Sequence, residues 1–142
     1  MKFLSVIIIG VLSISYQPVV SAERLLVTYF GNNAYPIRHP EVAAEYQADL
    51  AHYNLDAVRN LEQSLAEGLP TDREAAEAQA NARLDQLDPE VTNRMFDGLA
   101  YSLQWQVRKI PAFVFGDGEY VIYGVTDTAT ALRHYFRSRK VR

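Results

Sequence analysis

The sequence predicts a mixed α/β fold, and three observations carry that prediction. Two β-branched and aromatic runs, Ala112–Phe115 and the run ending at Tyr123, flank Gly116-Asp117-Gly118, a pattern typical of a β-hairpin. A third apolar run, Leu25–Phe30, predicts a buried strand near the other end of the chain. Helical periodicity dominates the long segment between them, from about residue 56 to 107.

The hairpin is bounded by residues with clear positional meaning. Pro111 cannot donate to a β-ladder, so we expect it at the first position of its strand. Gly124 ends the second strand, and Thr126 or Asp127 then predicts the N-cap of a last helix. The apolar face of that helix comprises Ala129, Leu132 and Phe136.

The first 22 residues have the features of a secretory signal peptide. Lys2 supplies a positive charge, Phe3–Ile14 an apolar stretch, and Val20-Ser21-Ala22 a small-residue cleavage pattern. We expect cleavage after Ala22, an exported chain and one domain over 23–142. An uncleaved anchor is the alternative, although the apolar stretch is shorter than the roughly 20 residues of a membrane span. We expect no stable membrane span after cleavage.

Composition argues against one class of function and excludes another. The chain has 14 basic and 17 acidic side chains, a balance that argues against direct nucleic-acid binding through a positively charged groove. It contains no cysteine, and disulfide exchange requires a thiolate. The chain therefore has no thiol–disulfide activity of its own.

The segment after the first strand is less regular. Gly31–Pro36 is a loop of turn-forming residues, and Pro40 predicts position N1 of a short helix that continues over 42–48. A second strand is expected at about Leu50–Asn54, where the alternation of apolar and polar residues is poor.

The predicted insertion at about 56–107 contains two or three helices. The first follows the apolar spacing of Leu55, Val58, Leu61 and Leu65, and Gly68 and Pro70 end it. Thr71-Asp72-Arg73-Glu74 reads as a capping box that begins an alanine-rich helix, which we expect to pack closely against a neighbour.

The last helix of the insertion has strong start signals. Asp88 predicts its N-cap and Pro89 its N1 position. Gly98, in mid-helix, costs about 1 kcal/mol relative to alanine, so we expect another backbone to approach it closely. Trp105 is interpreted as a core or interface anchor.

No arrangement of residues predicts catalysis. His39, His52 and His134 are scattered, no histidine pair has metal-binding spacing on a helix, and no nucleophile elbow is present. We therefore expect no catalytic, metal-binding or cofactor-binding residues and no enzymatic activity. An enzyme that pairs a carboxylate with His39 or His52 in a pocket stays an alternative.

The chain ends in a cluster of cations: Arg133, His134, Arg137, Arg139, Lys140 and Arg142. Cations at a helix C-terminus complement the helix dipole. The cluster is therefore interpreted as a solvated helix end, with a contact to a partner or to an anionic lipid surface as the alternative.

The segment 111–124 resembles the C-terminal half of a thioredoxin fold. That resemblance implies that Pro111 is a cis-proline opening the third strand and that Gly124 is the glycine ending the fourth. It also implies that Gly31–Tyr35 stands where thioredoxin relatives carry Cys-x-x-Cys, so the redox motif is absent here. The expected fold is a thioredoxin-like sheet whose two halves are separated by an enlarged helical insertion.

A wider resemblance covers nearly all of the chain after residue 22. The segments that carry it are Leu55-Asp56-Ala57-Val58, Leu61-Glu62, Gly68-Leu69-Pro70, Arg83-Leu84, Lys109-Ile110-Pro111-Ala112 and Val121-Ile122-Tyr123-Gly124-Val125-Thr126-Asp127. The chain resembles a family of small exported proteins of integrating conjugative elements, similar to thioredoxin-like pilus-assembly components of conjugative type IV secretion. The resemblance implies a periplasmic role in DNA transfer, with other protein components of the transfer apparatus as partners.

A thioredoxin-like fold without thiols keeps its peptide-facing surface. The backbone before the cis-proline can pair with an extended segment of another protein, as in β-augmentation. The candidate partner-binding residues are Ile110, Pro111, Gly31, Asn32, Asn33 and Tyr35, while Pro111, Gly124 and Asp127 have structural roles. The leading hypothesis is a scaffold or assembly factor for conjugation, and the alternative is a chaperone-like peptide-binding module unrelated to DNA transfer.

Overall fold

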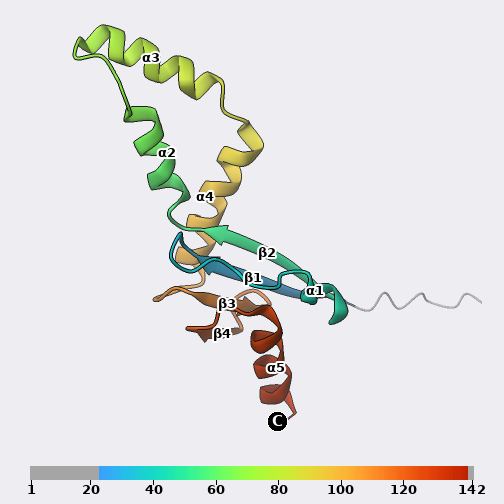
Figure 1. Cartoon of the computed structure of the whole chain (residues 1–142). Coiled ribbons are helices and arrows are strands. Elements are labelled where there is room, and N and C mark those ends of the chain that lie inside the picture. Colours follow the sequence, from blue (N-terminus) through green and yellow to red (C-terminus); the bar gives the residue numbers. More distant parts are fainter. Residues whose placement is uncertain (1–22, 141–142) are drawn as a thin grey trace, which may run out of the picture.

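A computed structural model describes residues 23–140, and its centre is one four-stranded mixed sheet (Figure 1). The strands are β1 (Leu25–Gly31), β2 (Ala48–Asn54), β3 (Ala112–Phe115) and β4 (Tyr120–Tyr123), in the order β2-β1-β3-β4. β1 is parallel to β2 and antiparallel to β3, and β3 is antiparallel to β4. The signal peptide predicted at 1–22 and its cleavage after Ala22 lie outside the described residues.

Five helices complete the described part of the chain. They are α1 (Val42–Glu45), α2 (Ala57–Ala66), α3 (Arg73–Asp85), α4 (Pro89–Gln104) and α5 (Thr128–Arg139). In Figure 1, α2, α3 and α4 form an arm that stands away from the sheet, and α5 lies on the opposite side. The arm is the predicted insertion, and it comprises three helices. None of the helices within residues 23–140 is both long and apolar enough to cross a bilayer.

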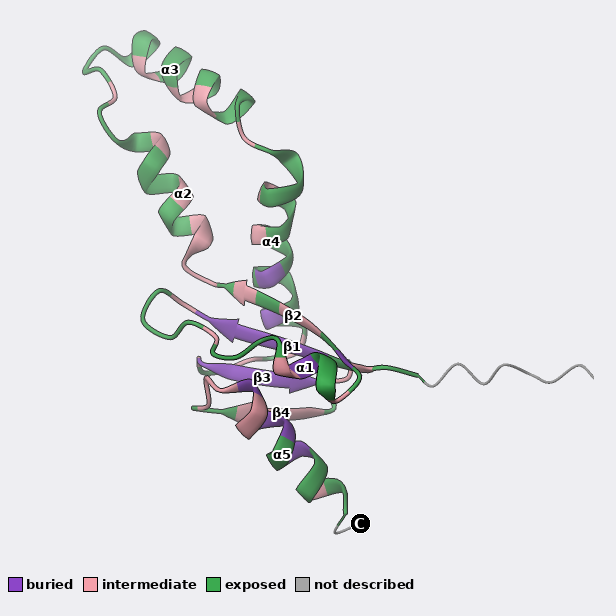
Figure 2. Cartoon of the chain, turned by 45° about the vertical axis from the view of Figure 1, so that its right-hand side comes forward, coloured by how far each residue is buried: buried purple, intermediate pink, exposed green. Residues whose placement is uncertain are grey.

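The core lies between one face of the sheet and α1 and α5, as the purple segments of Figure 2 show. Alternate residues of the central strands, Val27, Tyr29, Phe113 and Phe115, pack there against α5. All four residues of β3 are buried, as their unbroken apolar sequence predicts for a strand covered on both faces.

The hairpin from Pro111 to Gly124 is confirmed in detail. The Ile110–Pro111 peptide bond is cis, and Pro111 directly precedes β3. Gly116 and Gly118 have φ values of 62° and 90°, a region that favours glycine. The amide of Gly124 donates to the carbonyl of Pro111 at 2.9 Å, which closes the hairpin at the proline end.

Three predicted element starts are corrected. The N-cap of α3 is Asp72, not Thr71, because the Asp72 carboxylate accepts the amide hydrogen of Ala75 at 2.9 Å. The short helix begins at Val42, so Pro40 precedes it and does not occupy N1. β2 begins at Ala48, two residues earlier than expected, because parallel pairing with Leu25 and Leu26 extends the strand.

The arm packs less closely than the alanine content of α3 predicts. Neither α2 nor α3 contains a buried residue, and Ala75, Ala78 and Ala82 are exposed (Figure 2). The expectation of close helix–helix packing along α3 is therefore wrong, because alanine also favours a helix simply through its small entropic cost.

A single arginine joins the two helices at the tip of the arm. Nη1 of Arg83 in α3 donates to the carbonyls of Ser64, Leu65 and Glu67, at 3.1, 3.0 and 2.7 Å. These carbonyls belong to the end of α2, where a helix has no internal partners for them. Arg83 therefore caps α2 from α3.

Gly98 is where α4 meets the sheet. A Cβ atom built there would lie 2.7 Å from Cβ of Tyr53 in β2. Close approach is confirmed, but it is to a side chain and not to the backbone that the sequence predicted. Glycine lets α4 lie directly on the end of β2 and so fixes the base of the arm.

Candidate functional site

The predicted partner-binding residues meet at the end of the sheet where β1 and β2 finish and β3 begins. We call the Gly31–Tyr35 loop and Ile110–Pro111 the proline edge. Phe30 pairs with Ala112 across β1 and β3, and continuing this register places Gly31 opposite Pro111. Two segments about 80 residues apart in the chain therefore share one edge, as the sequence predicted.

Ile110 brings free hydrogen-bonding groups to the proline edge. Within residues 23–140 neither the amide nor the carbonyl of Ile110 makes a hydrogen bond, although the residue is half-buried. The neighbouring Pro111 carbonyl is already taken by Gly124. Because backbone polar groups at partly buried positions need partners, Ile110 offers one donor and one acceptor to an incoming chain.

The loop of the proline edge is held in a fixed shape by its own hydrogen bonds. The Tyr29 hydroxyl donates to the Tyr35 carbonyl at 2.7 Å, and burial raises the pKa of Tyr29 to about 12. The side-chain oxygen of Asn32 accepts the amides of Ala34 and Tyr35 at 3.1 and 3.0 Å. The Tyr35 side chain itself is 46% exposed, so the loop presents an aromatic ring to solvent.

A network of amide side chains fastens the loop to the base of the arm. The side-chain oxygen of Asn33 accepts Nδ2 of Asn54 at 2.8 Å and Nδ2 of Asn60 at 3.4 Å. The Asn33 backbone amide donates to the Asp56 carboxylate at 3.3 Å. Asn33 therefore faces the junction of β2 and α2, while Gly31 faces Pro111. The loop connects the arm to the proline edge.

A pocket of about 410 Å³ lies beside the loop. Its lining includes Asn32, Tyr35, Ile37 and His52, and no carboxylate is among its lining residues. His52 thus lies near the predicted surface, but without the acidic partner that a general base needs. The pocket gives the loop a concave side against which an apolar side chain can pack.

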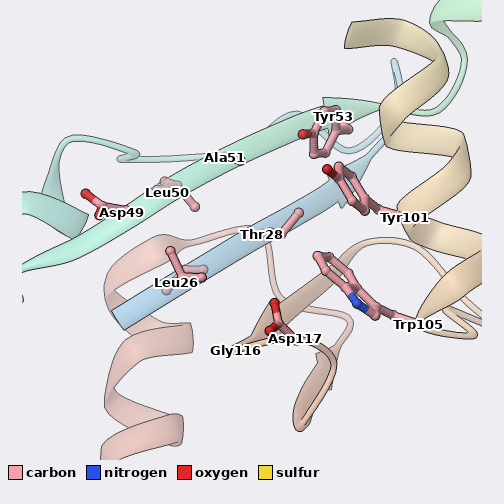
Figure 3. Close-up of a pocket in the computed structure, with 11 residues that line it drawn as sticks. Leu26, Thr28, Asp49, Leu50, Ala51, Tyr53, Tyr101, Trp105, Gly116 and Asp117 are labelled. Carbon is pink, nitrogen blue, oxygen red and sulfur yellow. The ribbon is translucent and has the colours of Figure 1, made fainter. Parts of the chain in front are cut away.

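The face of the sheet opposite α5 carries a second hollow, of about 420 Å³ (Figure 3). Leu26 and Thr28 form its floor, because they alternate along β1 with residues that face the core. Tyr101 and Trp105, from the end of α4, cover one end of this face. Their rings stack with centroids 5.2 Å apart.

Trp105 combines packing with an unpaired donor. Its ring meets Phe30 edge-on at 6.0 Å, and a Cβ built at Gly118 would lie 2.9 Å from its Cδ1. Trp105 is therefore an anchor for the face opposite α5, as interpreted from the sequence. Its Nε1 is buried and has no hydrogen-bond partner within residues 23–140, which carries a desolvation penalty of about 1–3 kcal/mol.

His39 does lie beside a carboxylate, the arrangement that the enzyme alternative requires. Nδ1 of His39 is 2.7 Å from Oδ2 of Asp127. Asp127 is the N-cap of α5, and its other oxygen accepts the amide and the hydroxyl of Thr130 at 2.8 and 2.7 Å. The Thr130 hydroxyl, followed by His39, holds the pKa of Asp127 far below its usual range. The pair ties the 36–40 loop to the start of α5, a structural role that accounts for every contact of the carboxylate.

Asp127 makes acid stability testable. A carboxylate whose pKa is lower in the folded state stabilises the fold above its unfolded pKa of about 3.9, and this stabilisation disappears as the pH falls. Between about pH 6 and about pH 2, we expect wild type to lose more unfolding free energy than Asp127→Asn. The amide oxygen of the new asparagine can still accept the Thr130 amide hydrogen, so the helix cap is kept. Urea unfolding across this range measures the difference. Parallel curves for the two proteins would contradict it.

Within residues 23–140 no three His, Asp or Glu side chains gather closely enough to hold a metal ion.

The outer side of α4 leaves Phe96, Leu99 and Leu103 exposed, at i, i+3 and i+7. Such an apolar stripe on a helix is typical of a surface that packs against another protein.

The sequence predicted that the two segments of the proline edge lie together, but it did not predict the residues that support the loop. The sequence does not predict the roles of Asn54, Asn60 and Asp56, because a polar side chain gives no local signal of a distant partner. The sequence does not predict the contact of Tyr53 with Tyr101 either. Burial raises the pKa of Tyr53, and the neighbouring Tyr101 and Asp97 raise it further. The available signal was the position of asparagines just after β1, at Asn32 and Asn33, and at the end of β2, at Asn54.

Fold and site together define a small mixed α/β protein with a helical arm and, at one end of its sheet, backbone groups of Ile110 without a hydrogen-bond partner among the described residues. The family described as "Protein of unknown function (DUF1525)" matches residues 36–140, which is most of the chain. The chain belongs to this family. Neither a curated protein nor a solved structure matches it.

Proposed function

We propose that this chain is a thioredoxin-like, non-redox assembly factor or scaffold of a conjugative DNA-transfer apparatus, acting in the periplasm without enzymatic activity. The proposal rests on the resemblance to proteins of integrating conjugative elements. Its thioredoxin-like part is supported by the order of features at the C-terminal end: a cis-proline before β3, a tight hairpin, Gly124 and a covering helix. β3 also pairs with β1, as that interpretation requires.

The observation that carries the binding role is the free backbone of Ile110. A donor and an acceptor lie beside Pro111 where the central strand β3 begins, next to a rigid loop that exposes Tyr35. An extended segment of a partner can pair with that backbone and place a side chain in the pocket beside the loop. The absence of cysteine excludes disulfide exchange, so capture at this edge is non-covalent.

A photo-crosslinking amino acid at position 110 tests the proposal in cells that assemble the transfer apparatus. We expect an adduct with another component of the apparatus at position 110 and none at position 73, where Arg73 is 92% exposed on the arm. The absence of an adduct at position 110 would count against the proline edge as the contact surface.

Transfer frequency gives an independent readout. We expect deletion of the chain to abolish transfer, and Tyr35→Ala to weaken partner binding by about 30-fold, the usual loss for a buried interface aromatic. Among the described residues only the backbone of Tyr35 is hydrogen-bonded, so the Tyr35→Ala variant should keep the wild-type fold. Leu84→Ala, which truncates a similarly exposed side chain on the arm, is the control and should transfer normally.

The alternative function predicts a different combination of results. If deletion leaves transfer unchanged while position 110 still captures extended peptides, the chain is a peptide-binding module unconnected with conjugation. That outcome would overturn the conjugative role and retain the proline edge.

A further inference from the structure

The outer side of α5 carries a compact group of cations and aromatic rings. α5 buries Thr128, Ala131, Leu132 and Tyr135 against the sheet, so its opposite side faces outward. Arg133, Arg137 and Lys140 lie on that outward side, since they are spaced i, i+4 and i+7. Together with Tyr46 and Phe136 they line a hollow of about 530 Å³, which we call the basic–aromatic surface.

The two rings of this surface are fixed in place. Tyr46, just after α1, stacks on Phe136 with centroids 5.7 Å apart and planes at 17°. Phe136 also meets Tyr135 edge-on at 5.3 Å, yet remains 38% exposed. The surface therefore presents a packed aromatic ring between cations. Because this ring is already ordered, it loses little conformational entropy on binding.

Within residues 23–140 the cations of the surface make no ion pair, although Nη2 of Arg133 donates to the Thr130 hydroxyl at 3.0 Å. The ion pairs within residues 23–140 involve Arg24, His39, Arg59 and Arg73, and none involves α5. Arg139 is engaged differently, since Nη1 donates to the Tyr135 hydroxyl and its guanidinium lies over the Tyr135 ring. Arg133, Arg137 and Lys140 are therefore available to an anionic ligand.

Charge is separated along the molecule. Five of the 14 basic residues and none of the 17 acidic residues follow Asp127. α5 and the arm lie on opposite sides of the sheet in Figures 1 and 2, and α2 and α3 with the turn between them carry many of the carboxylates. An anionic surface would attract α5 and repel the arm, which orients the whole protein.

We propose that the basic–aromatic surface binds an anionic phospholipid bilayer, with headgroup phosphates between Arg133, Arg137 and Lys140 and the Phe136 ring at the interface. A cationic helix face with an exposed aromatic residue is the usual design of a peripheral membrane contact. A long nucleic acid fits less well, because an acidic chain with one short basic helix repels most of a polyanion. A peptide fits less well because no strand residue lines the surface, so an extended chain finds no strand backbone to pair with.

Vesicle co-sedimentation tests this contact with the chain that begins at Glu23. We expect binding to vesicles of equal parts phosphatidylglycerol and phosphatidylcholine in about 0.1 M salt, and no binding in about 1 M salt, where charges are screened beyond about 3 Å. We expect no binding to pure phosphatidylcholine. The triple variant Arg133→Gln, Arg137→Gln, Lys140→Gln should bind on the order of 100-fold more weakly.

A matched variant separates the surface from net charge. Arg59→Gln, Arg73→Gln, Arg94→Gln removes the same charge from exposed positions of the arm and should bind as wild type does. The triple variant at α5 should keep the wild-type unfolding temperature, because all three side chains are exposed.

Four results would overturn the proposal. The first is failure of wild type to sediment with the anionic vesicles, and the second is retention of binding by the α5 variant. Millimolar inorganic phosphate that fully displaces the protein would show recognition of a free anion and not of a bilayer. A wild-type oligomer in solution that dissociates in the α5 variant would place a second copy on this surface.

Discussion

Replacing Phe115 with alanine should lower the free energy of unfolding by about 3–5 kcal/mol, the range for truncating a fully buried aromatic residue. Phe115 is fully buried, and its ring stacks on Tyr135 of α5 with centroids 4.4 Å apart and planes at 6°. A small domain has only about 5–15 kcal/mol of stability in total. The substitution therefore removes a large share of the stability, and we expect Phe115→Ala to unfold at a clearly lower urea concentration than wild type. Circular dichroism and urea unfolding measure the loss.

The chain contains a matched control for this substitution. Phe96 lies on the outer side of α4 and is 50% exposed. Phe96→Ala removes the same atoms from a half-solvated position, so its cost should stay below about 1 kcal/mol. Equal losses for the two variants would show that the core does not lie between β3 and α5.

Replacing Gly31 with alanine should distort the proline edge and destabilise the fold by about 2–3 kcal/mol. A Cβ at this position would lie 2.4 Å from the Tyr35 carbonyl oxygen and 2.6 Å from Cε1 of Tyr29. The first of these atoms belongs to the backbone and cannot turn away as a side chain can. The loop has to move, and the bond from the Tyr29 hydroxyl to the Tyr35 carbonyl is then lost.

Ala34→Val is the control for this loop. Ala34 is exposed, so a larger side chain there meets solvent and should change stability by less than about 0.5 kcal/mol. Unfolding free energies test both variants, and position-110 crosslinking tests the edge. If Gly31→Ala is as stable as wild type, the loop does not have the tight geometry described above.

The hairpin, the first strand and the cap at Asp127 could be predicted because their signals are local. Gly116-Asp117-Gly118 needs only its own backbone preferences to form a turn, and Asp127 caps a helix that begins one residue later. β2 was placed too late for the opposite reason. Its first residues, Ala48 and Asp49, are poor strand formers and become strand only through pairing with β1.

The site was predicted in part for the same physical reason. A proline before an apolar strand and a loop after another are visible in the chain, so Ile110, Pro111 and Gly31 were found. The partners that hold the loop lie 21 and 27 residues from Asn33, too far along the chain for local sequence preferences to pair them. The packing of α3 also could not be read, because alanine is favoured both in tight helix contacts and in solvated helices.

The sparse packing of the arm has a consequence for how the protein meets a partner. α2 and α3 bury no residue, and Arg83 is the main link between them, so they add little to the free energy that keeps the sheet folded. Local opening of such a segment is a low-energy fluctuation that leaves the rest of a protein intact. α2 and α3 are thus free to adopt the shape that a larger assembly imposes, while α4 stays packed on the sheet and the strands keep their arrangement.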